Sequence, residues 1–225
     1  MDTDIDKETT LLSGKLIKEA LSPLVYGGHL LQHKLGDNFL GVFGNALTPT
    51  TCKSLIELFE RKRSEGFTGP GRIANTVDPG QKHSQDWQML GMPLTDPDAY
   101  LVEVLLATLT ACFSQYQDRY SSLKLYANMG WSSLQLQKYS ADQNMGYPAP
   151  HVEASGPEVS HRVLAGLIYL NTINTGGTVF PYQDTKVPPT AGSIVLFPAG
   201  YTRLHWGEYA LQDKYIITTW LEFME

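Results

Sequence analysis

Long apolar runs, cysteine clusters and an excess of basic residues are all missing from this sequence. No apolar run approaches the roughly 18 residues that a membrane-spanning helix needs. The two cysteines, Cys52 and Cys112, form no spaced metal-binding motif, and we expect free thiols in a reducing compartment, by default the cytoplasm. Lys and Arg number 17 against 23 Asp and Glu, so a nucleic-acid backbone is not expected as a standing partner. These deficits predict a cytoplasmic protein that binds neither membranes nor nucleic acids.

The first ten residues also lack the apolar stretch of a secretory signal, because M-D-T-D-I-D-K-E-T-T is acidic and polar. We expect residues 1–10 to be a disordered tail, followed by a short helix over Leu11–Leu21 that Ser22-Pro23 ends. A chain of 225 residues suits one domain with a sizeable core, and its 42% hydrophobic residues are ordinary for a globular protein. The expected organisation is therefore the tail and a single domain, 11–225.

Two amphipathic helices are expected in the first half of that domain, after a strand at Asn38–Leu47. Thr48 has the character of an N-cap and Pro49 that of a first helical residue. The apolar stripe of this helix is Cys52, Leu55, Ile56 and Phe59. Asp96-Pro97 is expected to open the second helix. Its stripe is Val102, Leu106, Leu109, Phe113, Tyr116 and Tyr120. Both stripes indicate core packing rather than cofactor binding.

Two long irregular segments separate the expected elements. Glu65–Gln81 is rich in Gly, Pro and Thr, and Ala141–Pro150 contains Gly, Pro and Asn. Loops of this length in a compact domain are often functional. We expect both to form the rim and lid of a substrate site.

From Trp131 onward the periodicity changes to two. Ser133, Gln135, Gln137 and Tyr139 fall on one face of a strand, which is either exposed to solvent or lines a cleft. Further strands are expected at Arg162–Asn171, Thr178–Phe180, Ser193–Phe197 and Lys214–Phe223. Helices first and short strands afterwards predict an α+β fold: a double-stranded β-helix, or jelly roll, over 131–225, buttressed by the helices and first strands of 11–125.

His151, Glu153 and His205 are the candidate metal ligands. On an extended segment, residues two apart point to the same face, so the side chains of His151 and Glu153 are expected to lie together. His205 is expected on a different strand. Two imidazoles and one carboxylate suit Fe(II), Mn(II) or Zn(II), and as a facial triad they leave positions open on the metal.

These residues belong to an ordered set of motifs: His151 with Glu153, Arg162 ahead of Tyr169 in a strand ending Y-L-N, G-G-T-V-F at Gly176–Phe180, His205, and Lys214 nine residues later. Over Trp131–Leu221 the set resembles the 2-oxoglutarate and Fe(II)-dependent dioxygenases of the prolyl-4-hydroxylase-like branch. The family usually has Asp where this chain has Glu153.

The resemblance implies Fe(II) as the metal, with 2-oxoglutarate and O2 as cosubstrates. It also implies that Lys214 pairs with the distal carboxylate of 2-oxoglutarate, that the Tyr169 hydroxyl contacts the same carboxylate, and that Tyr139 lies in the cleft. The implied reaction hydroxylates an aliphatic carbon of an amino acid, a peptidyl residue or a small natural product, with release of succinate and CO2. Glu153 favours hydroxylation over halogenation, which needs a small residue at that position.

Two rival interpretations remain. One is a jelly-roll binding module that has lost its chemistry, with Glu153 as the sign of decay. The other is a cupin-like metal enzyme without a keto-acid cosubstrate. His205 and Lys214 argue against the first, and Lys214 and Tyr169 argue against the second.

The roles of four further residues are left open by the sequence. Thr218 and Trp220 share a strand face with Lys214 and could border the cofactor pocket or pack in the core. Arg203 could point into the cleft or lie at its rim. Glu158 is a poorer candidate ligand than Glu153, because it follows a Ser-Gly-Pro turn.

Overall fold

The computed structural model describes residues 32–35, 38–73 and 76–224. The expected tail at 1–10 and the expected helix at Leu11–Leu21 lie outside these ranges. Within them, no helix has both the length and the apolar character needed to cross a membrane.

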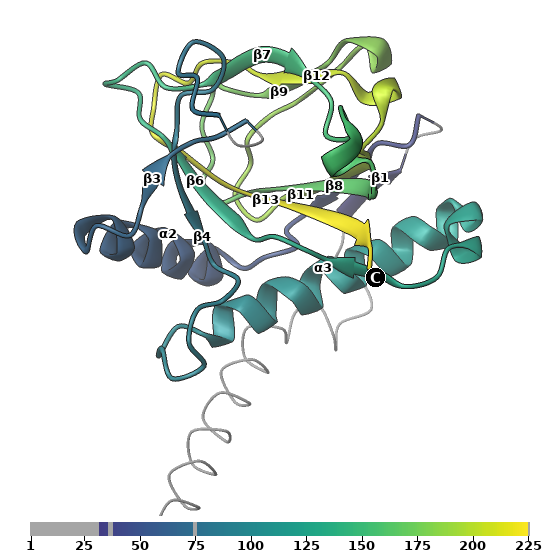
Figure 1. Cartoon of the computed structure of the whole chain (residues 1–225), viewed down its shortest axis with the longest axis horizontal. Coiled ribbons are helices and arrows are strands. Elements are labelled where there is room, and N and C mark those ends of the chain that lie inside the picture. Colours follow the sequence, from purple (N-terminus) through teal and green to yellow (C-terminus); the bar gives the residue numbers. More distant parts are fainter. Residues whose placement is uncertain (1–31, 36–37, 74–75, 225) are drawn as a thin grey trace, which may run out of the picture.

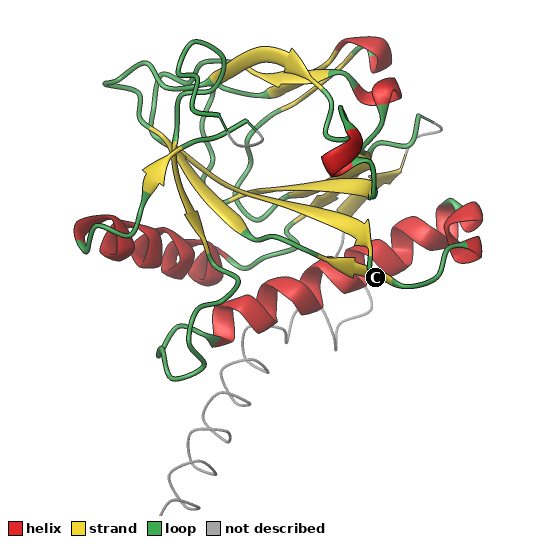
Figure 2. Ribbon diagram, in the orientation of Figure 1, coloured by secondary structure: helices red, strands yellow, loops and turns green. Residues whose placement is uncertain are grey.

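Two antiparallel sheets face each other across the interior of the molecule (Figures 1 and 2). The larger sheet contains β1 (Gln32–Leu35), β2 (Gly41–Gly44), β11 (Ile194–Pro198), β8 (Arg162–Tyr169), β13 (Lys214–Phe223), β6 (Gln135–Tyr139), β4 (Gln85–Gln88) and β3 (Gly69–Pro70), with β5 (Met129–Trp131) paired to β13. The smaller sheet is β10 (Thr185–Val187), β9 (Thr178–Phe180), β12 (His205–Gly207) and β7 (Tyr147–His151). This is the predicted jelly roll in an α+β fold.

Two helices cover the outer face of the larger sheet, as the sequence predicted (Figure 1). Helix α2 (Pro49–Ser64) begins at the expected cap, where Thr48 Oγ1 accepts a hydrogen bond from the Thr51 backbone N–H at 3.1 Å. Helix α3 (Tyr100–Arg119) begins after Ala99, three residues later than Asp96-Pro97 suggested.

The sheet separates two cores because side chains alternate along its strands. Toward the helices lies an apolar cluster that includes Leu55, Leu105, Ile168 and Ile217. Toward the smaller sheet lies a second cluster that includes Leu167, Tyr169, Phe180, Phe197 and Ile216. Strand β13 contributes to both, with Tyr215, Ile217 and Leu221 on the helix side and Ile216 on the interior side. The candidate site is on the interior side.

The buried stripe of α3 is displaced from the expected one. The buried residues of this helix are Leu101, Val104, Leu105, Thr108, Leu109, Cys112 and Tyr116. Val102, Leu106 and Phe113 are only partly buried and flank that face. The displacement arises because α3 is apolar around much of its circumference, so two neighbouring stripes fit the sequence equally well.

Several strand boundaries also differ from expectation. The strand expected at Asn38–Leu47 is reduced to Gly41–Gly44, and strand β7 begins inside the segment Ala141–Pro150 that we expected to be a loop. Strands β9 and β13 have the predicted bounds. The segment Glu65–Gln81 contains the two-residue strand β3 but is otherwise irregular where it is described.

Candidate active site

A cavity of about 350 Å³ is lined by residues from both sheets. From the larger sheet, residues of β6, β8 and β13 reach it, and from the smaller sheet, residues of β7, β9 and β12. The expected polar face of β6 lines this cavity through Gln135, Gln137 and Tyr139, together with Ser133 just before the strand. The choice between solvent and cleft is therefore settled in favour of the cleft.

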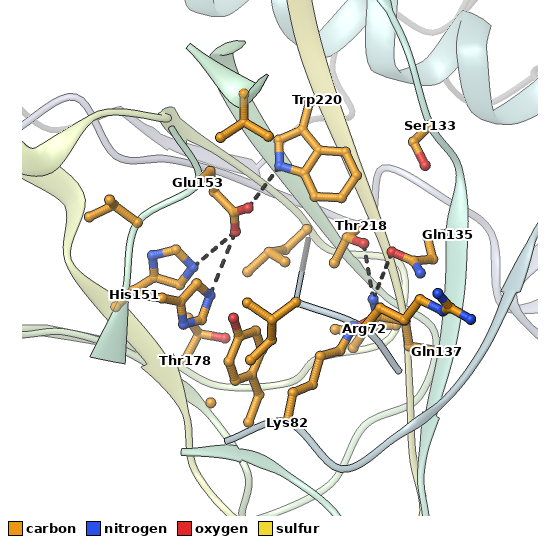
Figure 3. A pocket seen from close by; sticks show the side chains of 18 of the residues that line it. Arg72, Lys82, Ser133, Gln135, Gln137, His151, Glu153, Thr178, Thr218 and Trp220 are labelled. Atoms are coloured by element: carbon orange, nitrogen blue, oxygen red, sulfur yellow. Dashed lines mark hydrogen bonds and ion pairs between the residues drawn. The ribbon is translucent and has the colours of Figure 1, made fainter. Parts of the chain in front are cut away.

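His151 and Glu153 lie together at one side of the cavity (Figure 3), and His205 converges on them. One potential ligand atom from each of the three lies within 4.8 Å of the others. Glu153 Oε1 is 3.7 Å from His151 Nε2 and 3.3 Å from His205 Nε2. His151 ends β7 and His205 begins β12, and the two residues are direct partners in the register of these strands. Strand pairing thus brings together residues 54 positions apart in the sequence.

Glu153 lies just beyond β7 rather than within it. The backbone N–H groups of Glu153 and Ala154 both donate to the carbonyl oxygen of Ala199, at 3.1 and 2.9 Å. These bonds fix the backbone where the strand ends, so the carboxylate still reaches both imidazoles.

The two imidazoles are oriented by backbone carbonyl groups. His151 Nδ1 is 2.8 Å from Ala149 O, and His205 Nδ1 is 2.9 Å from Arg203 O. Because a carbonyl oxygen only accepts, each Nδ1 carries the hydrogen, and in the neutral ring Nε2 then presents a lone pair. The Tyr147 ring stacks on His151 at 3.9 Å between centroids and 7° between planes, which further fixes that imidazole.

This donor set fits a divalent cation. Burial, followed by the nearby His205, lowers the pKa of His151 to about 4, so this ring is neutral near pH 7. Burial raises the pKa of Glu153, but hydrogen bonding and charge interactions with His205, together with His151 and Trp220, outweigh it and bring the value to about 2. A buried carboxylate and imidazole lone pairs directed at one point are stabilised by a shared cation.

Lys214 occupies a different part of the same cavity. The residue is 3% exposed, and Nζ donates a hydrogen bond to Gly176 O at 3.0 Å. Nζ also lies 4.7 Å from the centroid of the Tyr139 ring. Burial lowers the pKa of Lys214 to about 8. A buried ammonium group whose hydrogen-bond acceptor is a neutral carbonyl is suited to binding an anionic ligand.

The two tyrosines predicted to touch the cosubstrate have different surroundings. Tyr139 lines the cavity, and its hydroxyl donates to Gln137 Oε1 at 2.8 Å. Tyr169 is fully buried, with its hydroxyl 2.7 Å from Thr178 Oγ1. Thr178 is the member of this pair that lines the cavity. Direct contact of Tyr169 with a cosubstrate stays a prediction, and Thr178 is a polar contact that the sequence did not single out.

A polar wall faces His151 and Glu153 across the cavity (Figure 3). Gln137 Nε2 is hydrogen-bonded to Thr218 Oγ1 at 3.2 Å and to Gln135 Oε1 at 3.3 Å, and Gln135 Nε2 donates to Asp86 at 3.0 Å. Asp86 in turn pairs with the buried Lys82 at 2.8 Å. Sequence reasoning missed Lys82 and Asp86, because only the pairing of β4 with β6 brings Asp86 opposite Gln137.

The open questions about Arg203, Thr218 and Trp220 are also resolved. Thr218 and Trp220 line the cavity. Arg203 is neither in the cleft nor at its rim: it is buried, and its guanidinium donates to the carbonyl oxygens of Thr202 and Asn38. Arg203 therefore ties the segment before β12 to the segment before β2. Glu158, the competing carboxylate, is exposed in a short 3-10 helix at Pro157–Val159.

Part of the chain matches a known protein family. Residues 134–222 match the family model of the 2OG-Fe(II) oxygenase superfamily. No curated protein sequence matches the chain.

Solved structures resemble the whole fold. A prolyl hydroxylase from Trichoplax adhaerens, in complex with a peptide of the hypoxia-inducible factor oxygen degradation domain, has a TM-score of 0.68 and 17% identity over 99% of this chain and 94% of its own. A prolyl-4-hydroxylase from Pseudomonas putida has a TM-score of 0.62 and 14% identity, covering 95% of this chain and 100% of its own. The 2OG complex of a viral collagen prolyl hydroxylase from Paramecium Bursaria Chlorella virus-1 has a TM-score of 0.58 and 17% identity, covering 83% of this chain and 97% of its own.

At these identities the solved structures establish the fold, while the matched segment contains His151, Glu153, His205 and Lys214. Residues 134–222 thus match the 2OG-Fe(II) oxygenase superfamily, which indicates an oxygenase that uses Fe(II), 2-oxoglutarate and O2, and the fold is the jelly roll found in the similar prolyl hydroxylases.

Proposed function

We propose that this oxygenase hydroxylates an aliphatic carbon of a peptidyl substrate, with Fe(II) held by His151, Glu153 and His205 and 2-oxoglutarate anchored by Lys214. The observation that carries the proposal is the convergence of these three side chains within 4.8 Å in a cavity that also contains a buried lysine. When bound, Fe(II) with 2-oxoglutarate and O2 supplies an oxidant for an unactivated C–H bond, and 2-oxoglutarate leaves as succinate and CO2.

The chain's own residues bind and orient. The Nδ1 bonds of the two histidines direct both Nε2 atoms at the metal position, as backbone carbonyls do in many metal sites. Lys214 supplies the positive charge for the distal carboxylate, and the buried surroundings strengthen that pair by excluding water. Tyr139 and Thr178 add hydroxyl groups to the lining of the cavity.

A peptidyl substrate is favoured by the hydrogen-bonding character of the opposite wall. Gln135, Gln137 and Thr218 present amide and hydroxyl groups that match the donors and acceptors of a peptide. Two of the similar structures are a prolyl hydroxylase in complex with a peptide and a collagen prolyl hydroxylase, and we extend a peptidyl substrate from them to this chain. We further propose a cytoplasmic setting, in keeping with the buried free thiols of Cys52 and Cys112, and neither nucleic acid nor membrane as partner.

Anaerobic addition of Fe(II) and 2-oxoglutarate tests the proposal. We expect the visible charge-transfer band of a chelated keto acid with the wild-type protein and its loss in His205→Ala. Metal binding without the band would favour a cupin-like enzyme, and failure to bind metal would favour an inactive binding module. Succinate release on addition of a peptide pool, with one peptide gaining the mass of an oxygen atom, would then identify the substrate class. Turnover with free amino acids alone would contradict the peptidyl assignment.

A further inference from the structure

The two oxygens of the Glu153 carboxylate have different partners. Oε1 faces both histidines, at 3.7 and 3.3 Å from their Nε2 atoms. Oε2 accepts a hydrogen bond from the indole Nε1–H of Trp220 at 2.8 Å (Figure 3). One oxygen is thus directed at the metal position while the other is already occupied.

Trp220 is itself held in place by Arg162. The Arg162 guanidinium carbon lies 3.9 Å from the centroid of the Trp220 ring, within the range of a cation–π contact. Arg162 Nε donates to Glu222 Oε1 at 3.1 Å, and Nη1 donates to the Glu153 backbone carbonyl at 3.0 Å. Arg162 Nη1 also lies 3.7 Å from Glu153 Oε2, so this guanidinium contacts the indole, both the main chain and the carboxylate of Glu153, and a carboxylate on β13.

These contacts restrain the side chain of Glu153, which is longer than the aspartate that the family usually has at this position. Compared with aspartate, glutamate has one more methylene and one more rotatable bond, so its carboxylate samples more positions unless something restrains it. The Trp220 N–H restrains the far oxygen, and Arg162 restrains both the indole and the backbone from which the side chain projects.

We propose that Trp220 and Arg162 are positioning residues that make Glu153 a ligand through one oxygen, and that the Trp220 hydrogen bond is specific to glutamate at this position. The inference rests on the metal site of the proposed function. Aspartate, shorter by a methylene, would not bring a carboxylate oxygen both to the histidines and to the indole nitrogen. The contribution of Trp220 to metal affinity must therefore depend on residue 153.

A double-mutant cycle measured with Mn(II) tests this dependence. Mn(II) binding is followed by the electron paramagnetic resonance signal of the free ion, without turnover. Trp220→Phe keeps an aromatic ring beneath Arg162 but removes the N–H. We expect it to weaken Mn(II) binding about tenfold, the effect of one hydrogen bond to a charged group. In the Glu153→Asp background the same substitution should change binding by less than about twofold.

Trp131→Phe is the matched control, because Trp131 lies on the neighbouring β5 and packs edge-on against Phe113 on the helix side of the sheet. It should bind Mn(II) like the wild type. Equal losses from Trp220→Phe in the wild-type and Glu153→Asp backgrounds, or no loss in either, would overturn the inference. Full Mn(II) binding by Glu153→Ala would instead contradict the metal site itself.

A metal-free measurement covers the case in which Trp220→Phe folds poorly. The chain has four tryptophans, and Trp131→Phe, Trp87→Phe and Trp206→Phe assign the remaining indole N–H signal to Trp220 by elimination in a 15N spectrum. In Glu153→Asp the Trp220 indole N–H signal should move upfield, and its hydrogen should exchange faster with deuterium. Both changes are expected because the shorter aspartate no longer accepts the hydrogen bond. An unchanged signal would show that Trp220 does not hold Glu153.

Discussion

At the scale of single residues, Lys214 is an ammonium group removed from water. It is buried with a backbone carbonyl as its hydrogen-bond acceptor. If it pairs with the distal carboxylate of 2-oxoglutarate, Lys214→Ala should weaken 2-oxoglutarate binding by roughly 2–4 kcal/mol, since one partner of a buried pair is lost. Mn(II) binding should survive. An unchanged half-saturation for 2-oxoglutarate would contradict the role given to Lys214.

The same residue predicts a pH dependence. Burial lowers the Lys214 pKa to about 8 in the folded protein, so the free enzyme loses this positive charge as pH rises through 8. Affinity for 2-oxoglutarate should fall above that pH, by up to about tenfold per pH unit until the higher pKa of the liganded lysine is reached. Binding titrations from about pH 6.5 to about pH 9.5 check this, because they cover roughly 1.5 units on each side of the transition. Lys214→Arg, which stays charged, should show no such fall.

The free energy of unfolding should change in the opposite direction and increase as the pH rises. Because the folded pKa of Lys214 is lower than the unfolded one, the unfolded chain binds more protons between these two values. Below the folded pKa, the buried ammonium charge therefore destabilises the folded protein to its full extent. As the pH rises above that pKa, the folded lysine loses its proton and the destabilisation decreases. Without ligand, Lys214→Met should be more stable than wild type by on the order of 2 kcal/mol near neutral pH, with a smaller difference in alkali. Thermal unfolding at both pH values measures it.

Glu153 carries the most specific residue-level prediction. Glu153→Ala should abolish hydroxylation and sharply reduce iron affinity, because the negative charge that balances the cation is lost. Glu153→Asp keeps that charge and should retain partial activity. Succinate release and iron binding are to be measured side by side. A Glu153→Ala enzyme that hydroxylates near the wild-type rate would refute the proposed metal site.

The sequence was sufficient to predict that these ligands converge, but it did not predict the residues that support them. His151, Glu153 and His205 stand at spacings typical of the family, so the order of motifs identifies them. The hydrogen bond from Trp220 to Glu153 and the pair Lys82–Asp86 depend on which strands are neighbours and in which register. Arg203 was misjudged for a similar reason, because one of its acceptors, Asn38 O, is 165 positions away in the sequence.

At the scale of elements, the beginning of α2 offers a test that is separate from the chemistry. Thr48 Oγ1 accepts the Thr51 N–H, so Thr48→Ala should lower the free energy of unfolding by about 1 kcal/mol. Thr48→Ser keeps the acceptor and should be close to wild type. Because α2 packs on the outer face of the sheet, 2-oxoglutarate affinity should not change in either variant. A loss of affinity in Thr48→Ala would show that α2 influences the cavity.

Element prediction succeeded where local signals were strong. The cap and proline at Thr48-Pro49 indicated the beginning of α2, and the β-branched and aromatic residues of Lys214–Phe223 indicated both ends of β13. It missed the short strands β4 and β10, and it misplaced the stripe of α3, where tertiary packing selects one of two apolar faces. The short strands exist because neighbouring strands supply their hydrogen bonds, which no local pattern records.

At the scale of the whole molecule, the two segments expected to be loops border the cavity, although strand β7 begins within the second. Arg72 and Ile73 of Glu65–Gln81 and Tyr147 of Ala141–Pro150 line it, and a pair of backbone hydrogen bonds between His83 and Gly146 joins the regions. A lid formed by these segments stays a prediction. A substrate that supports succinate release should slow tryptic cleavage after the exposed Arg72 beyond the effect of iron and 2-oxoglutarate.

Cleavage after Lys124, which lies in the 3-10 helix Ser121–Leu125 that follows α3, serves as the internal control and should not change. Arg72→Gln identifies the fragment by its disappearance. Equal rates after Arg72 with and without a substrate that is turned over would argue against a lid.

The position of β13 between its neighbours constrains how this enzyme could evolve. The strand is hydrogen-bonded to β8 along one edge and to β6 and β5 along the other, and its two faces serve different cores. Its backbone cannot shift without disturbing both. A change of cosubstrate would therefore have to come by exchanging side chains such as Lys214 on a fixed frame. Substrate preference can drift more freely in the part of Glu65–Gln81 that follows strand β3, where insertions and deletions leave the sheet intact.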